Sequence, residues 1–162
     1  MKNPAVILNL DNALFNLGLV EEKAKESGLY AVVKADAYGH GALGFARFLN
    51  ENGVRHFVAG SLDEGRQLRE SGVSGEILIM GATPTENVEE LSFFDLSQSV
   101  FCAEYARELA FAARLKGVKV KIHAKVDTGM NRLGFSWFNP EEIAEACPAS
   151  AFETVGVFTH FG

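Results

Sequence analysis

The sequence contains only two cysteines, Cys102 and Cys147, and they lie far apart in a chain of 162 residues. A disulfide-stabilised fold or a structural zinc site requires several cysteines or histidines at short, repeated spacings. Neither pattern is present. We therefore expect two reduced, partly buried thiols, as in a cytoplasmic protein, and no metal site.

The sequence also lacks an excess of positive charge, a long apolar run and any low-complexity segment. Its net charge of −6 argues against nucleic acid as a partner, because binding to phosphates requires clustered lysines and arginines. The apolar stretch at residues 5–10 is interrupted by Asn9 and Asp11 before it reaches the length of a signal peptide or a membrane helix. With 48% hydrophobic and 22% charged residues, we expect one globular domain with no targeting segment and no membrane partner.

Short apolar segments alternate with amphipathic segments along the chain. Strands are expected at residues 5–10, 30–35, 56–59, 76–80, 96–101, 119–126 and 154–160. Helices are expected at residues 11–27, 42–51, 61–71, 85–92 and 103–116, and after a cap at Asn139. Such alternation implies a parallel α/β sheet, which is either doubly wound or a (β/α)₈ barrel.

The expected strand at residues 119–127 favours the barrel. One of its faces is apolar and the other is polar: Val120, Ile122, Ala124 and Val126 against Lys119, Lys121, His123, Lys125 and Asp127. A doubly wound sheet would bury the charged face under helices, whereas a barrel turns it toward a lumen that can hold a cofactor. We therefore expect a TIM-like barrel.

The number of strands is too small for a complete barrel. About six strands are expected after the one at residues 5–10, whereas a full barrel has eight strands and about 250 residues. We therefore expect a partial (β/α)₈ barrel, that is, a fragment. Its unpaired sheet edges would make it unstable or prone to self-association.

The segment at residues 31–41, AVVKADAYGHG, is expected to be a strand ending in Lys34, followed by a glycine-containing turn and a helix. A rigid strand can hold a lysine where an aldehyde cofactor meets it, and the N-terminus of a helix can bind a phosphate. From the residues alone, a solvated lysine beside a loop tyrosine, Tyr38, remains an alternative. We expect Asp36 and His40 to order the loop and assign them no catalytic role.

Three segments carry a resemblance to a known family. The run VVKADAYGHGA resembles the pyridoxal phosphate (PLP) signature of alanine racemases, and residues 125–135, KVDTGMNRLGF, resemble that family's second hallmark. Residues 156–161, GVFTHF, are similar to the strand that places a histidine beside the cofactor ring. The resemblance spans the chain but covers only the first part of a family member. It implies that residues 1–162 are the N-terminal portion of a PLP-binding barrel whose C-terminal β domain is absent, and that the strand at residues 5–10 lies outside the barrel.

The resemblance also implies roles for five residues. Lys34 would hold PLP and move the substrate's α-proton on one face, and Tyr38 would donate its hydroxyl to the cofactor phosphate. Arg132 would meet the cofactor's phenolic oxygen and the substrate carboxylate. Lys125 would be carbamylated and would position that arginine, and His160 would lie against the pyridine ring. Each residue also has a structural alternative as an ordinary strand, lumen, surface or core residue.

The implied activity is the PLP-dependent interconversion of L- and D-alanine by a cytoplasmic homodimer, which supplies D-alanine for peptidoglycan. The second base would come from the C-terminal domain of the partner subunit, so we expect negligible racemase activity from these residues alone. The alternatives are a non-catalytic PLP-binding barrel, a racemase of another amino acid such as serine, a basic amino acid decarboxylase, and a structural domain without a cofactor.

Overall fold

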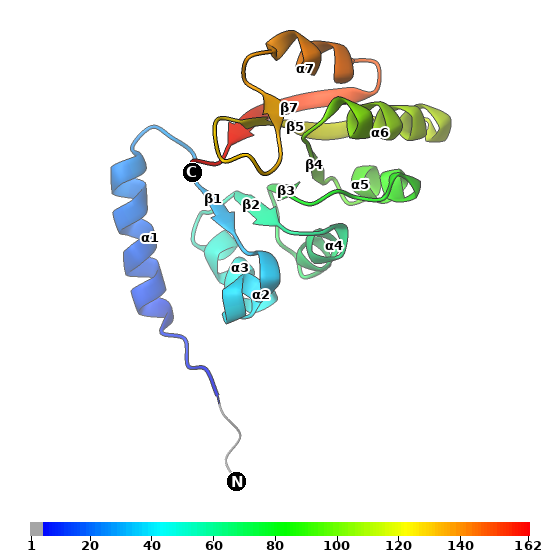
Figure 1. Cartoon of the computed structure of the whole chain (residues 1–162). Coiled ribbons are helices and arrows are strands. Elements are labelled where there is room, and N and C mark those ends of the chain that lie inside the picture. Colours follow the sequence, from blue (N-terminus) through cyan, green and yellow to red (C-terminus); the bar gives the residue numbers. More distant parts are fainter. Residues whose placement is uncertain (1–4) are drawn as a thin grey trace.

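Residues 5–162 are described by the structure, a computed structural model, and they form a curved sheet with helices along its outer side (Figure 1). The strands are β1 (Tyr30–Val32), β2 (His56–Ala59), β3 (Glu76–Ile79), β4 (Ser97–Val100), β5 (Val120–Asp127), β6 (Phe135–Ser136) and β7 (Phe152–Thr159). The helices are α1 (Leu10–Ala24), α2 (Lys34–Gly39), α3 (Ala42–Glu51), α4 (Leu62–Glu70), α5 (Val88–Phe93), α6 (Ala103–Lys116) and α7 (Pro140–Ala146), with a 3-10 helix η1 at Thr85–Asn87.

All strand pairs of the sheet are parallel, in the order β1-β2-β3-β4-β5-β7, with the short β6 also paired to β5. Each strand of this order pairs with the strand before it, and helices connect successive strands on the same side, as in a (β/α) barrel. Within residues 5–162, β1 and β7 are the two edges and do not pair with each other. The expected α/β partial barrel is confirmed.

The two faces of β5 differ as expected. Val120 and Ile122 are fully buried in the hydrophobic core between the sheet and its helices. On the other face, His123 and Lys125 are each only 6% exposed and contact polar partners. The concave side of the sheet therefore carries buried polar groups, which a doubly wound sheet would cover with helices.

Helices with strong local signals begin and end where the sequence predicts. The helix α6 ends at Lys116, followed by Gly117 at φ +66°, a backbone conformation that glycine adopts without strain. The helix α4 is capped by Ser61, whose hydroxyl accepts a hydrogen bond from the Glu64 amide at 3.3 Å. These signals lie at the helix ends themselves and do not depend on tertiary contacts.

The strand expected at residues 5–10 is not formed. Residues 5–9 have no regular structure, and α1 begins at Leu10 after Asn9, whose side chain accepts a hydrogen bond from the Asn12 amide at 2.9 Å. No described strand lies beside this segment, and Val6 is 77% exposed. An apolar segment without a neighbouring strand cannot form a sheet.

The helix α1 stands apart from the sheet (Figure 1). Of its residues only Leu17 is buried, and several large apolar side chains are exposed: Leu10, Leu14, Phe15, Leu19 and Val20. None of the described helices combines the length and the hydropathy that crossing a membrane requires.

Candidate functional site

The parallel strands place three of the predicted site residues at one rim of the sheet. Lys34 follows the carboxyl end of β1, Arg132 lies in the loop after β5, and His160 directly follows β7. Because the carboxyl ends of parallel strands share one edge of a barrel, the three residues lie on the same side of the sheet. No hydrogen bond or ion pair joins them within residues 5–162.

The backbone after Lys34 differs from the expected strand and glycine turn. The strand β1 ends at Val32, and residues Ala35, Asp36, Ala37 and Tyr38 form a left-handed turn, with φ between +50° and +55°. For residues other than glycine, this conformation costs roughly 1–2 kcal/mol each. The turn persists only if the surrounding structure holds it in place.

Several hydrogen bonds hold this turn. The Asp36 carboxylate accepts from the Ala42 amide at 2.7 Å, and His40 Nδ1 lies 2.9 Å from the carbonyl oxygen of Ala37. The expectation that Asp36 and His40 order the loop is therefore confirmed. The Glu64 carboxylate accepts from the amide of Ala35 at 3.0 Å, which ties the turn to α4.

Lys34 and Tyr38 carry the reactive groups of the turn. Lys34 is half-buried and packs close to Gly60 at the end of β2. A Cβ added to Gly60 would lie 3.3 Å from the Cβ of Lys34. The Tyr38 side chain is 63% exposed, and its hydroxyl has no hydrogen-bond partner within residues 5–162. Both polar groups remain available to a ligand.

The loop that carries Arg132 is held at its start, directly after β5. The Asp127 carboxylate accepts from the amides of Gly129 at 2.9 Å and Asn131 at 3.1 Å, and these bonds hold the pKa of Asp127 below its usual range. The Thr128 hydroxyl lies 2.7 Å from that of Thr159, the last residue of β7. The loop and the strand that leads to His160 are therefore connected.

Lys125 lies beneath this loop and donates a hydrogen bond from Nζ to the carbonyl oxygen of Leu133. Burial and then the positive charge of Arg132 lower the pKa of Lys125, and the opposite charge of Asp127 offsets this only partly. The structure thus brings Lys125 close enough to Arg132 for their charges to interact. A lysine with a lowered pKa has a larger neutral fraction and is a better nucleophile.

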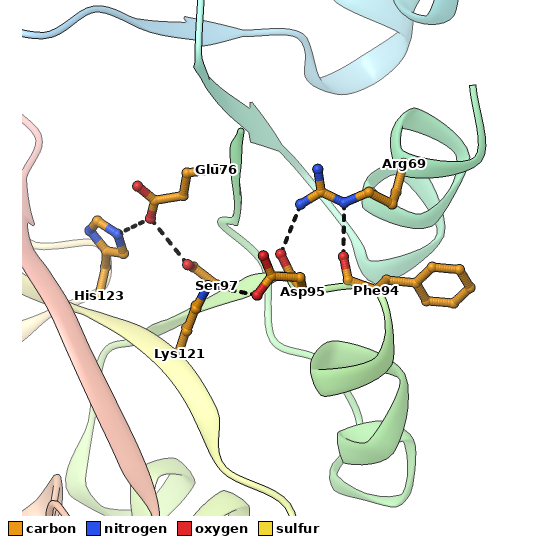
Figure 2. Close-up of polar contacts among 7 residues, drawn as sticks. All are labelled: Arg69, Glu76, Phe94, Asp95, Ser97, Lys121 and His123. Carbon is orange, nitrogen blue, oxygen red and sulfur yellow. Dashed lines mark hydrogen bonds and ion pairs between the residues drawn. The ribbon is translucent and has the colours of Figure 1, made fainter. Parts of the chain in front are cut away.

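A second polar cluster on the concave side was not predicted. The Glu76 carboxylate accepts from the Ser97 hydroxyl at 3.1 Å and lies 2.5 Å from His123 Nε2 (Figure 2). It also accepts from the Tyr30 hydroxyl at 2.6 Å. Burial would raise the pKa of Glu76, but the hydrogen bonds from Tyr30 and His123 outweigh it and lower the pKa. The cluster lies at the amino ends of β1 and β3, away from the rim that carries Lys34.

Beside this cluster, Arg69 and Lys121 make structural contacts (Figure 2). Arg69 donates to the carbonyl oxygens of Phe94 and Asp95, each at 2.9 Å, just after the end of α5. Lys121 Nζ lies 2.6 Å from the Asp95 carboxylate. Only the polar face at residues 119–127 pointed to these contacts in the sequence, because the other partners depend on the register of separate strands.

Comparison with known proteins identifies a family. The family described as "Alanine racemase, N-terminal domain" matches residues 8–162. An alanine racemase of Carboxydothermus hydrogenoformans is 40% identical over 156 residues, and one of Clostridium perfringens strain SM101 is 40% identical over 159 residues. These matches cover 95% of this chain but only 42% and 40% of the two relatives.

Solved structures agree with these relatives. The alanine racemase of Clostridium difficile 630 in complex with cycloserine superposes with a TM-score of 0.87 at 35% identity, covering 96% of this chain and 43% of that one. The alanine racemase of Bacillus anthracis with bound L-Ala-P gives 0.85 at 27% identity, covering 98% and 43%. The similarity therefore holds along nearly the whole chain, and the chain belongs to the alanine racemase N-terminal domain family.

Proposed function

We propose that residues 1–162 are the N-terminal portion of the PLP-binding barrel of an alanine racemase, an isomerase that interconverts L- and D-alanine. The observation that carries the proposal is the left-handed turn that holds Lys34 at the same rim as Arg132 and His160. Strained backbone of this kind is concentrated at functional sites. The C. difficile and B. anthracis relatives hold cycloserine and L-Ala-P, which supports a ligand of the alanine class.

The residues at the rim fit an anionic aldehyde cofactor. Lys34 offers an amine, Tyr38 a hydroxyl and Arg132 a guanidinium group, and within residues 5–162 none of the three is bound by a carboxylate. Amine, hydroxyl and guanidinium are the groups that bind an aldehyde, a phosphate and a phenolic oxygen or carboxylate. This donor set is therefore suited to PLP.

Each residue has a distinct task in this proposal. When bound, PLP supplies the electron sink for loss of the α-proton. Lys34 would hold the cofactor, and its amine, when free, would accept or return the α-proton on one face of the substrate. Tyr38 would donate to the phosphate, and His160 would lie against the ring. Arg132 orients the substrate carboxylate, and a carbamate on Lys125 fixes the direction of that guanidinium group.

Racemisation requires a second base on the opposite face. In our proposal that base comes from the C-terminal domain of the partner subunit in a cytoplasmic homodimer that supplies D-alanine for peptidoglycan. The chain spans about two fifths of the length of the curated relatives it matches. We therefore expect negligible alanine turnover by these residues alone; turnover near that of a complete racemase would contradict this.

Cofactor binding tests the proposal directly. PLP is added to the chain, the visible spectrum is recorded, the product is reduced with borohydride and the labelled peptide is mapped. We expect a label on Lys34 that the substitution Lys34→Arg removes and Lys23→Arg, on the exposed surface of α1, does not. Label scattered over surface lysines, or none, would refute the proposal.

A further inference from the structure

The Glu64 carboxylate bridges two backbone amides at the rim of the sheet. It accepts from the Gly60 amide at 2.7 Å, directly after β2, and from the Ala35 amide at 3.0 Å, directly after Lys34. The sequence predicts a capping box in which this side chain would bond to the Ser61 amide. In the structure the carboxylate reaches past its own helix and joins α4 to the left-handed turn.

The Glu64 carboxylate binds backbone amides and does not pair with the charged amine of Lys34. Neither Lys34 nor Glu64 makes an ion pair with any residue in the part of the chain that the structure describes. Gly60 makes the arrangement possible, since a Cβ at this position would lie 3.2 Å from Glu64 Oε2 and 3.3 Å from Lys34 Cβ. Because Gly60 has no side chain, both the Glu64 carboxylate and the Lys34 side chain can lie close to the end of β2.

The turn depends on such an anchor. Its four residues, Ala35 to Tyr38, are in a conformation that is unfavourable without support. Asp36 and His40 bond within the segment or to the adjacent α3, whereas Glu64 comes from a separate βα unit. A hydrogen bond to a charged acceptor is also stronger than one between neutral groups.

We propose that Glu64 is a positioning residue that fixes the direction of the Lys34 amine by holding the peptide group next to it. This inference rests on the proposed role of Lys34 as the PLP-binding lysine. Glu64 touches neither substrate nor cofactor in this proposal; it acts through the Ala35 amide. Without it, the turn samples other conformations and the amine points toward the cofactor for a smaller fraction of the time.

The test compares Glu64→Gln with Asp63→Asn in the full 162-residue chain. Glutamine keeps the size of the side chain but replaces one carboxylate oxygen by an NH₂ group. This group cannot accept a hydrogen bond, so the bond from either the Ala35 or the Gly60 amide is lost. Asp63 is the neighbouring carboxylate of α4, is mostly exposed and contacts Arg66, not the turn. Amide hydrogen exchange is measured at Ala35, and the rate of borohydride-trapped PLP attachment is measured at Lys34.

We expect Glu64→Gln to speed exchange at Ala35 and slow PLP attachment to Lys34, each by about tenfold. Asp63→Asn should leave both within about twofold, and amides in α6 should be unaffected. Glu64→Asp, which keeps the charge but reaches less far, should give a smaller effect. Unchanged exchange at Ala35, or an equal loss of protection in α6, would overturn the inference. Failure of PLP to label Lys34 in the wild-type chain would refute the proposed function, while exchange at Ala35 would still decide the role of Glu64.

Discussion

His123 Nε2 lies 2.5 Å from Glu76 Oε1 although the two residues belong to β5 and β3, with β4 between them. The contact requires the imidazole to lean across the concave side of the sheet. Space for the ring comes from the pairing of β5 with β7, in which the register shifts between Ile122 and His123 of β5 and Gly156 of β7 faces the ring. The register shift and Gly156 in the β5–β7 pair thus leave room for His123 to contact Glu76 on β3.

Substituting Gly156 by alanine should destabilise the fold. A Cβ at this position would lie 2.8 Å from His123 Nδ1, so the ring would have to move and loosen its bond to Glu76. We expect a loss of about 1–3 kcal/mol in the free energy of unfolding, measured by urea denaturation. The control is Gly44→Ala in α3, where nothing lies within 4 Å and alanine should stabilise by about 0.5–1 kcal/mol. Equal effects of the two substitutions would contradict this explanation.

The lowered pKa of Glu76 predicts an acid-sensitive contribution to stability. A carboxyl group with a depressed folded pKa stabilises the fold above its unfolded value, near 4.5, and loses that contribution as the pH falls through the folded pKa. Tyr30→Phe removes one of the bonds that depress this pKa. We expect the variant to be less stable at pH 7, by about 1–3 kcal/mol, with the difference shrinking in acid. Urea denaturation between pH 2.5 and 7 tests this, and a difference that stays constant with pH would show that the ionised carboxylate is not responsible.

Replacing alanine by glycine should have opposite effects on stability in the left-handed turn and in the helix α6. Ala35 has φ +51°, so Ala35→Gly relieves strain and should raise the free energy of unfolding by about 1 kcal/mol. Ala112→Gly, inside α6, should lower it by about the same amount. Thermal unfolding distinguishes the two, and destabilisation by both would mean that the turn is not left-handed in solution.

Arg132 should control the reactivity of Lys125. Its positive charge helps lower the pKa of Lys125, so Arg132→Gln raises that pKa and reduces the neutral fraction at a given pH. We expect less carbamate at Lys125 when the chain is incubated with ¹³C-labelled bicarbonate and followed by carbon NMR. Lys125→Arg, which cannot form the carbamate, identifies the signal. An undiminished signal in Arg132→Gln would exclude this coupling.

Local features of the fold could be predicted from the sequence, and features that depend on distant partners could not. The bounds of α3, α6 and β2 follow from apolar periodicity and from nearby capping residues, and the structure reproduces them. The expected strand at residues 5–10 failed because strand formation depends on a neighbour. The rim positions of Lys34, Arg132 and His160 follow from parallel strand order, but the roles of these residues remain predictions.

Three parts of the site could not be predicted from the sequence. Nothing in the run KADAYG predicts four consecutive residues in a left-handed turn, because alanine and tyrosine disfavour that conformation. The spacing of Ser61 and Glu64 indicates a helix start, but the bond from the Ala35 amide to Glu64 depends on how the turn after β1 packs against α4. In the same way, the contacts among Tyr30, Glu76 and His123 depend on the register of three strands.

The strand order also has a consequence for how the chain acquires its structure. From β2 to β5 and then β7, each new strand pairs with one that has already been synthesised. Each pairing closes only the segment that connects one strand to the next in this order, so its entropic cost is small. A nascent chain emerging from the ribosome can therefore add one βα unit at a time to an existing sheet edge, without waiting for distant sequence.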